Sequence, residues 1–136
     1  MNIQEVRAFE VDLSKAATPA GSYNRAGRQP AAPTERYTRY RGNRSAASPN
    51  WKRCGCIVTT EDGTQGFGLT NYSGPVMSII NDHFRHHMVG ESVMATEKLY
   101  DMMTRISSSY GSSGLTACAI SAVDLASWDA NGKVLG

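Results

Sequence analysis

The alternation of apolar and polar residues divides the chain into a strand-forming start, a long stretch with no period, and a periodic remainder. Apolar and charged residues alternate imperfectly over Ile3–Leu13, which predicts a first strand. Two β-rich stretches, Trp51–Thr60 and Thr64–Asn71, flank the turn Glu61–Gly63. Asp-Gly is a strong hairpin signal because these residues accept the positive φ of a tight turn. We therefore expect a small antiparallel sheet of three strands.

Three helices are expected after the sheet. The first begins at Ser73 and ends at Gly90, the second begins near Ser92, and the third runs over Leu115–Asn131. Helical spacing predicts these inner faces: Val76, Ile79, Ile80, His83 and His87 in the first; Met94, Leu99, Met102, Met103 and Ile106 in the second; Leu115, Cys118, Ala119, Ala122, Val123 and Ala126 in the third.

Small residues predict a close approach between the third strand and another element. Gly66 and Gly68 flank Phe67 in that strand, and the third helix carries small residues on its inner side. The order of three strands followed by three helices is typical of an α+β domain, and it argues against a βαβ nucleotide-binding unit. We expect one domain over residues 1–136.

The long segment Ser14–Asn50 has neither a strand nor a helix period. Loops of this length are usually disordered segments or active-site lids. The segment is also strongly basic: between Asn24 and Arg53 there is one acid, Glu35, against Arg25, Arg28, Arg36, Arg39, Arg41, Arg44, Lys52 and Arg53. Since the net charge is only +2, the rest of the chain is acidic. A basic loop on an acidic body favours an anionic partner for the loop.

Composition narrows the class of protein. Apolar residues make up 40% and charged residues 19% of 136 residues, as in ordinary globular domains. No apolar run approaches the roughly 20 residues of a membrane span, and the charged start of the chain is unlike a signal peptide. Three cysteines do not suggest a secreted disulfide framework. We expect a cytoplasmic protein without membrane contact.

Two kinds of chemistry can be weighed on the residues alone. Cys54 and Cys56, with the three histidines of the first helix and Cys118, are the nearest approach to a zinc site, but no second cysteine pair completes a ligand set. Packing roles are favoured for them. The arginines and tyrosines of the long loop could form a nucleic-acid surface, but no nucleic-acid motif accompanies them and the pI is a mild 8.5.

The later part of the chain resembles the N-terminal capping domain of the mandelate racemase and muconate lactonizing group of the enolase superfamily. The resemblance is carried by AISAVDLASWDANGKVLG (Ala119–Gly136) and by TTEDGTQGFGLTN (Thr59–Asn71). Within that group, APTERYTRYRGNR (Ala32–Arg44) and SSYGSSGLTACAISAVDLASWD are similar to L-rhamnonate dehydratases.

The resemblance implies a function. The expected role is the cap and specificity domain of a hydro-lyase, in which a (β/α)8 barrel, absent from this chain, removes a proton α to a carboxylate and then water. Mg²⁺ and the catalytic groups would belong to the barrel, so the chain alone would be inactive. The segment 14–50 would act as the lid, with Arg44 binding the sugar acid. Asn24 stands where those enzymes carry a substrate-contacting histidine. A homo-oligomer is expected.

Two alternatives from other classes stay open. The chain could be a stand-alone binding module whose basic loop holds nucleic acid or an acidic protein, which a salt-dependent gel shift would reveal. It could also be a non-catalytic truncated fragment whose uncovered apolar helix faces cause aggregation.

Overall fold

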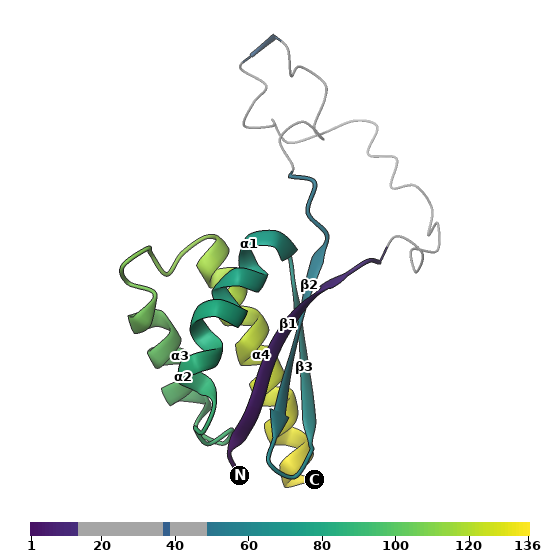
Figure 1. The fold of residues 1–136 in the computed structure, drawn as a ribbon, viewed down its shortest axis with the longest axis vertical. Helices are drawn as coiled ribbons and strands as arrows, with labels where there is room; N and C mark the ends of the chain where they lie inside the picture. The colour runs from purple at the N-terminus through teal and green to yellow at the C-terminus, as the bar shows by residue number, and fades with distance from the viewer. Residues whose placement is uncertain (14–36, 39–48) are drawn as a thin grey trace, which may run out of the picture. The chain divides into compact units, whose positions relative to one another are not determined.

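The computed structural model describes residues 1–13, 37–38 and 49–136. The chain divides into two units, one of Met1–Asp12 with Trp51–Gly136 and one of Leu13–Asn50. The first unit contains all the helices and strands that follow: β1 (Ile3–Val11), β2 (Arg53–Thr60), β3 (Gln65–Thr70), α1 (Ser73–Ser78), the π-helical segment η3 (Ile79–Phe84), α2 (Arg85–Met88), α3 (Thr96–Ile106) and α4 (Leu115–Leu135). The predicted α+β order is confirmed, and all four labelled helices lie on one side of the sheet (Figure 1).

The sheet is antiparallel in the order β1-β2-β3, as predicted. Its hairpin turn contains Gly63 with φ 85, and the Gly63 amide donates to the Thr60 carbonyl over 2.9 Å. Asp62 Oδ1 accepts from the Thr64 amide over 3.0 Å, which explains why Asp precedes Gly here. The strands are one or two residues shorter at their ends than predicted, most clearly at Leu13 and Trp51.

The first helical segment differs from its prediction. It is interrupted by the π-helical η3, and its buried apolar side chains, spaced four apart, are Val76, Ile80, Phe84 and Met88. A π turn contains more residues than an α turn, so it keeps a four-residue spacing on one face. The predicted inner positions His83 and His87 are therefore not in the core: His83 is half-buried and His87 is exposed.

The other two helices have different bounds from those predicted. The second begins at Thr96, not near Ser92, because Ser92 forms an isolated bridge with Asn2. Met94, predicted inside, is 41% exposed. The third continues to Leu135, since Gly132 has open space around it and does not stop the helix. Leu115, also predicted inside, lies exposed in the first turn.

The predicted close approach is confirmed between β3 and α4. A Cβ placed on Gly66 would lie 2.0 Å from the Ala126 carbonyl oxygen, and one on Gly68 would lie 2.0 Å from that of Ala122. Only a strand without side chains at these two positions lets the α4 backbone come this near. The remaining core joins the sheet to the helices through Ile3, Val6, Val58, Val93, Leu99, Met103 and Val123.

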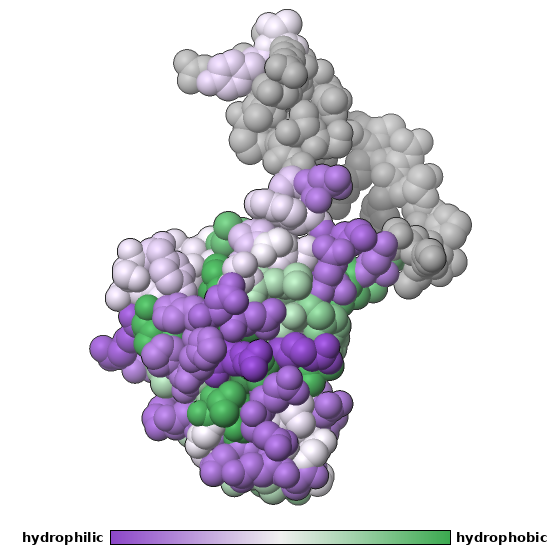
Figure 2. Space-filling model, viewed as in Figure 1, coloured by the Kyte–Doolittle hydropathy of each residue, from purple (hydrophilic) through white to green (hydrophobic). Residues whose placement is uncertain are grey.

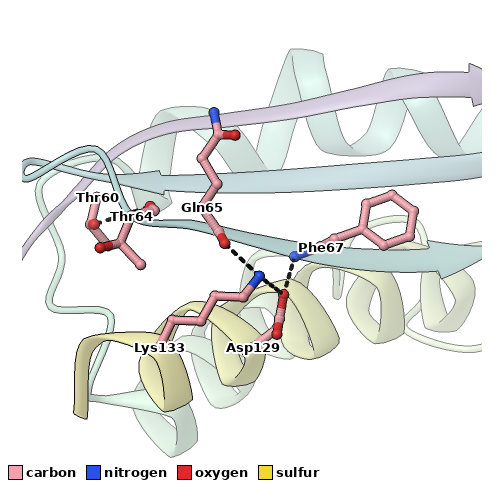
Figure 3. A network of polar contacts seen from close by, with 6 residues as sticks. All are labelled: Thr60, Thr64, Gln65, Phe67, Asp129 and Lys133. Atoms are coloured by element: carbon pink, nitrogen blue, oxygen red, sulfur yellow. Dashed lines mark hydrogen bonds and ion pairs between the residues drawn. The ribbon is translucent and has the colours of Figure 1, made fainter. Parts of the chain in front are cut away.

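Side chains of η3 and α4 form hydrogen bonds with backbone groups of the two edge strands, β1 and β3. On β1, Asn81 accepts from the Ala8 amide over 2.8 Å and donates to the Ala8 carbonyl over 3.0 Å. On β3, the Phe67 amide donates to Asp129 Oδ2 over 2.9 Å, and Lys133 Nζ donates to the Gln65 carbonyl over 2.9 Å (Figure 3). Exposed strand edges invite pairing with other chains, so these contacts protect the sheet from edge-to-edge association.

The surface seen from the viewpoint of Figure 1 is mainly hydrophilic, with apolar residues in separate patches (Figure 2). Among the helices in the described part of the chain, none combines the length and the hydropathy needed to cross a bilayer.

Candidate functional site at one end of the sheet

The two residues predicted to contact substrate, Arg44 and Asn24, lie outside the described residues. The structure does describe both points where the segment 14–50 joins the sheet, namely the end of β1 and the start of β2. We take this end of the sheet, opposite the Thr60–Gln65 hairpin, as the candidate site, because the segment with the two predicted substrate contacts begins and ends there. Its geometry is therefore the accessible part of the candidate site.

An ion-pair cluster ties the two attachment points together. Lys52 Nζ lies 3.3 Å from Glu10 Oε1 and 3.4 Å from Asp12 Oδ2. The hydrogen bond to Glu10, followed by that to Asp12, raises the pKa of Lys52, so its ammonium group stays charged. All three side chains are about half exposed, and such pairs contribute little to stability. They link the end of β1 to the residue before β2, next to the backbone pairing of Val11 with Arg53.

The turn from β3 into α1 packs against the same cluster. Ser73 Oγ donates to Glu10 Oε2 over 3.2 Å, and the Ser73 amide donates to the Lys52 carbonyl over 3.1 Å. Tyr72 is the sole non-glycine with positive φ among the described residues, at φ 60 and ψ 56. A left-handed conformation costs a bulky residue about 1–2 kcal/mol. Strain of this kind gathers at functional sites.

Two aromatic rings stand at this end of the sheet. The rings of Trp51 and Tyr72 meet edge-on with centroids 6.1 Å apart, and both side chains are partly open to solvent, at 48% and 37%. Gly74 leaves room for the indole, because a Cβ there would come within 3.1 Å of Trp51 Nε1. The arrangement places partly open aromatic surface beside a charged cluster.

Sequence reasoning did not find this cluster. Glu10, Asp12 and Lys52 are ordinary charged residues in an alternating pattern, and Tyr72 carries no signal of its left-handed backbone. The available signal was positional: these residues flank the two ends of the long segment and the turn that follows β3.

The residues weighed as a zinc set are not brought together. Cys54 and Cys56 are buried in β2, and burial raises the pKa of both thiols, that of Cys56 to about 12. Both are therefore protonated at neutral pH. Cys118 is partly buried in α4. Across residues 1–13, 37–38 and 49–136, no three His, Cys, Asp or Glu side chains converge on a point that could hold a metal ion.

One of the histidines, His83, instead links a helical segment to a loop. His83 Nδ1 lies 2.6 Å from the Tyr110 hydroxyl, and its ring meets that of His87 with centroids 5.5 Å apart. Burial, then the neighbouring charges of His87 and His86, lowers the pKa of His83. The contact fastens the loop after α3 to η3.

Comparisons with known proteins agree on one family. Residues 55–136 match the family described as mandelate racemase / muconate lactonizing enzyme, N-terminal domain. An L-rhamnonate dehydratase from Saccharopolyspora erythraea is 39% identical over 105 residues, which is 76% of this chain and 27% of that protein. The chain thus spans about a quarter of the length of the curated relatives it matches.

Solved structures agree with this. The crystal structure of L-rhamnonate dehydratase from Gibberella zeae matches this chain with a TM-score of 0.81 and 26% identity. The match covers 98% of this chain and 32% of the Gibberella zeae chain. A structure of that enzyme in complex with Mg has also been solved. The 3,6-anhydro-D-galactonate cycloisomerase from Zobellia galactanivorans matches 62% of this chain and 24% of its own, with a TM-score of 0.58 and 36% identity. With its sheet, its helices and its family match in agreement, the chain belongs to the mandelate racemase / muconate lactonizing enzyme N-terminal domain family of the enolase superfamily.

Proposed function

We propose that this chain is the capping and specificity domain of a magnesium-dependent sugar-acid dehydratase of the L-rhamnonate type. The reaction is removal of a proton α to a carboxylate, followed by loss of water, and a (β/α)8 barrel performs it. The observation that carries the proposal is the 39% identity to an L-rhamnonate dehydratase over three quarters of this chain, within a matched family. The chain alone is inactive, and the complete enzyme is a cytoplasmic homo-oligomer.

The physical case for a substrate role rests on the basic segment and its anchor. Arginine pairs bidentately with carboxylates and keeps its charge, so the arginines of segment 14–50 suit a sugar acid. Both ends of that segment join strands that pair with each other, and Lys52 forms ion pairs with Glu10 and Asp12 at this junction. A lid on a rigid base can close over a barrel mouth and exclude water. Arg44 binds the substrate carboxylate in this proposal, and Asn24 contacts a hydroxyl.

Magnesium is held by the barrel in this proposal. The carboxylates at the sheet end do not suit a metal, because Glu10 and Asp12 share the ammonium group of Lys52, which stands where a cation would bind. When bound in the barrel, the ion supplies charge stabilisation for the enolate. This chain's residues orient the substrate and shield it from water.

A chimera tests the proposal. Residues 1–136 replace the matching segment of the Saccharopolyspora erythraea enzyme, and the dehydration of L-rhamnonate and of other sugar acids is measured. We expect Arg44→Ala to raise KM by about tenfold to a hundredfold, since a charged hydrogen bond contributes about 1.5–3 kcal/mol. Asn24→Ala should have a smaller effect in the same assay.

The matched control is Arg105→Ala, because that guanidinium is exposed and pairs only locally, 2.7 Å from Asp101. It should leave KM unchanged. Equal KM values for Arg44→Ala and the unmutated chimera over the whole substrate panel would remove Arg44 from the site. A chimera that folds but dehydrates no sugar acid would contradict the proposed function itself.

A further inference from the structure

The three histidines of the chain lie together on one helical stretch, away from the candidate site at the sheet end. His83 belongs to η3, and His86 and His87 belong to α2. The buried positions of this stretch are taken by apolar side chains such as Phe84 and Met88, which leaves His83 half-buried and the other two histidines exposed. The proposed function uses none of the three.

His83 and His87 have the spacing of a metal-binding pair. Residues four apart on a helix lie on one face, and two histidines at this spacing hold zinc in the pattern His-Glu-x-x-His. Here the two rings contact each other, with centroids 5.5 Å apart and planes at 82°. Since zinc binds imidazole nitrogens at about 2.0–2.1 Å, rings this close can share one ion.

Tyr110 orients His83 from the loop after α3. Its hydroxyl lies 2.6 Å from His83 Nδ1, and the two rings meet with centroids 5.6 Å apart. A histidine that binds a metal with one ring nitrogen usually donates the other N–H to an oxygen, which fixes the tautomer and the ring orientation. With Nδ1–H donating to the Tyr110 oxygen, Nε2 of His83 is the nitrogen left for a metal ion.

The protonation state of His83 suits the same role. Burial, followed by the neighbouring charges of His87 and His86, lowers the pKa of His83. Its ring is therefore neutral at pH 7, and a histidine must be neutral to bind a metal ion.

We propose that His83 and His87 form a binding site for one divalent transition-metal ion of the class Zn²⁺, Ni²⁺ and Cu²⁺. Imidazole nitrogen suits these ions, whereas magnesium prefers oxygen ligands. The site binds without catalysing hydrolysis, because Phe84 stands where the zinc-protease pattern has its glutamate base. This inference goes beyond the proposed function and is independent of it.

The surroundings of the pair limit how tightly it can bind. Within the described parts of the chain, no third His, Cys, Asp or Glu side chain converges with the two histidines on a metal position. Water fills the remaining coordination positions, so binding is weaker than at a structural zinc site with four protein ligands. Arg85 lies between the two histidines in sequence, but residues two apart on a helix do not face each other.

Zinc titration of the 136-residue chain tests the site. Cys54 and Cys56 are buried, and Cys118→Ala removes the partly buried third thiol as a competing ligand. In this background, which is used for every variant below, calorimetry with zinc chloride should show one saturable site. The Tm should rise with zinc concentration, because the ion binds the native state.

Substitution of each histidine identifies the ligands. His83→Gln and His87→Gln should each weaken zinc binding by about tenfold or more, since loss of even an outer contact of a metal site costs about that much. His86→Gln, the matched control one residue away on the same helix, should leave the affinity unchanged. In NMR spectra, zinc should shift the ring signals of His83 and His87 and leave those of His86 in place.

Tyr110→Phe tests the orienting contact. The variant keeps the ring and removes the hydroxyl, so zinc binding should weaken by about tenfold while His83 and His87 remain the ligands seen by NMR. An unchanged zinc affinity would contradict the role of the Tyr110 hydroxyl.

Three results would overturn the site itself: no saturable zinc binding by the Cys118→Ala chain, an unchanged affinity in His87→Gln, or a loss in His86→Gln as large as that in His87→Gln. None of these experiments uses a sugar acid or the chimera. Their failure would therefore leave the proposed function standing, and an inactive chimera would leave the metal site standing.

Discussion

At the scale of single residues, two glycines set the distance between sheet and helix. A Cβ on Gly68 would lie only 2.0 Å from the carbonyl oxygen of Ala122. We predict that Gly68→Ala destabilises the domain by about 3 kcal/mol or more, because the α4 backbone must move. Urea unfolding followed by circular dichroism measures this. Gly132→Ala is the control: with nothing near it in a helix, it should stabilise the domain by about 0.5–1 kcal/mol.

Asn81 acts on a strand from within the π-helical segment. Its amide group makes both hydrogen bonds to Ala8, at 2.8 and 3.0 Å, in a partly buried position. We expect Asn81→Ala to cost about 2–3 kcal/mol, because it leaves a backbone donor and an acceptor of β1 without their partner. The exposed Asn71→Ala should be near neutral in the same urea titration. Equal stability of the two variants would show that water replaces the amide group at no cost.

At the scale of elements, the sequence predicted the sheet and the order of helices because those depend on local signals. Each of these signals is contained within a few residues: the Asp-Gly turn, the alternation in the strands, and the pair Gly66 and Gly68. The π turn was not predicted, because the spacing of apolar residues in this segment carries no signal that separates a π turn from an α-helix. The interior of the first helix was misassigned for the same reason, and His83 and His87 were placed inside where Phe84 and Met88 lie.

In the candidate site, too, the features that depend on local sequence were predicted, and those that depend on contacts between distant segments were not. Arginine content and loop length predict an anionic ligand, and these are properties of sequence. Tyr72's left-handed backbone and the sharing of Lys52 by Glu10 and Asp12 depend on where three chain segments meet. Such convergence has no signature within any one of the segments.

The contact of α4 with the edge of β3 depends on pH. The hydrogen bond from Lys133, then that from the Phe67 amide, lowers the pKa of Asp129. A lowered pKa means that the stabilisation is present above the unfolded value of about 3.9 and is lost as pH falls through the folded value. We predict that Asp129→Asn is less stable than the native chain at pH 7 and that the difference vanishes towards pH 2–3. Urea titrations across pH 2–7 measure it.

The control for this comparison is Asp101→Asn, whose carboxylate makes an exposed i,i+4 pair with Arg105. That pair touches no strand, so its removal should have little effect at any pH. A constant difference between Asp129→Asn and the native chain over the whole range would contradict an ionic role for Asp129.

At the scale of the whole molecule, the proposed function, with this chain as cap and magnesium in a barrel, predicts where the ion acts. A ligand that binds only the native state stabilises it by RT ln(1 + [L]/Kd), about 2.7 kcal/mol at a hundredfold excess over Kd. The 136-residue chain should therefore show the same Tm in millimolar Mg²⁺ and in EDTA, because the ammonium group of Lys52 already occupies the position between the carboxylates of Glu10 and Asp12 at the sheet end. The chimera should lose its dehydratase activity in EDTA and regain it with Mg²⁺. A magnesium-dependent rise in the Tm of the chain alone would instead place a metal site in the cap.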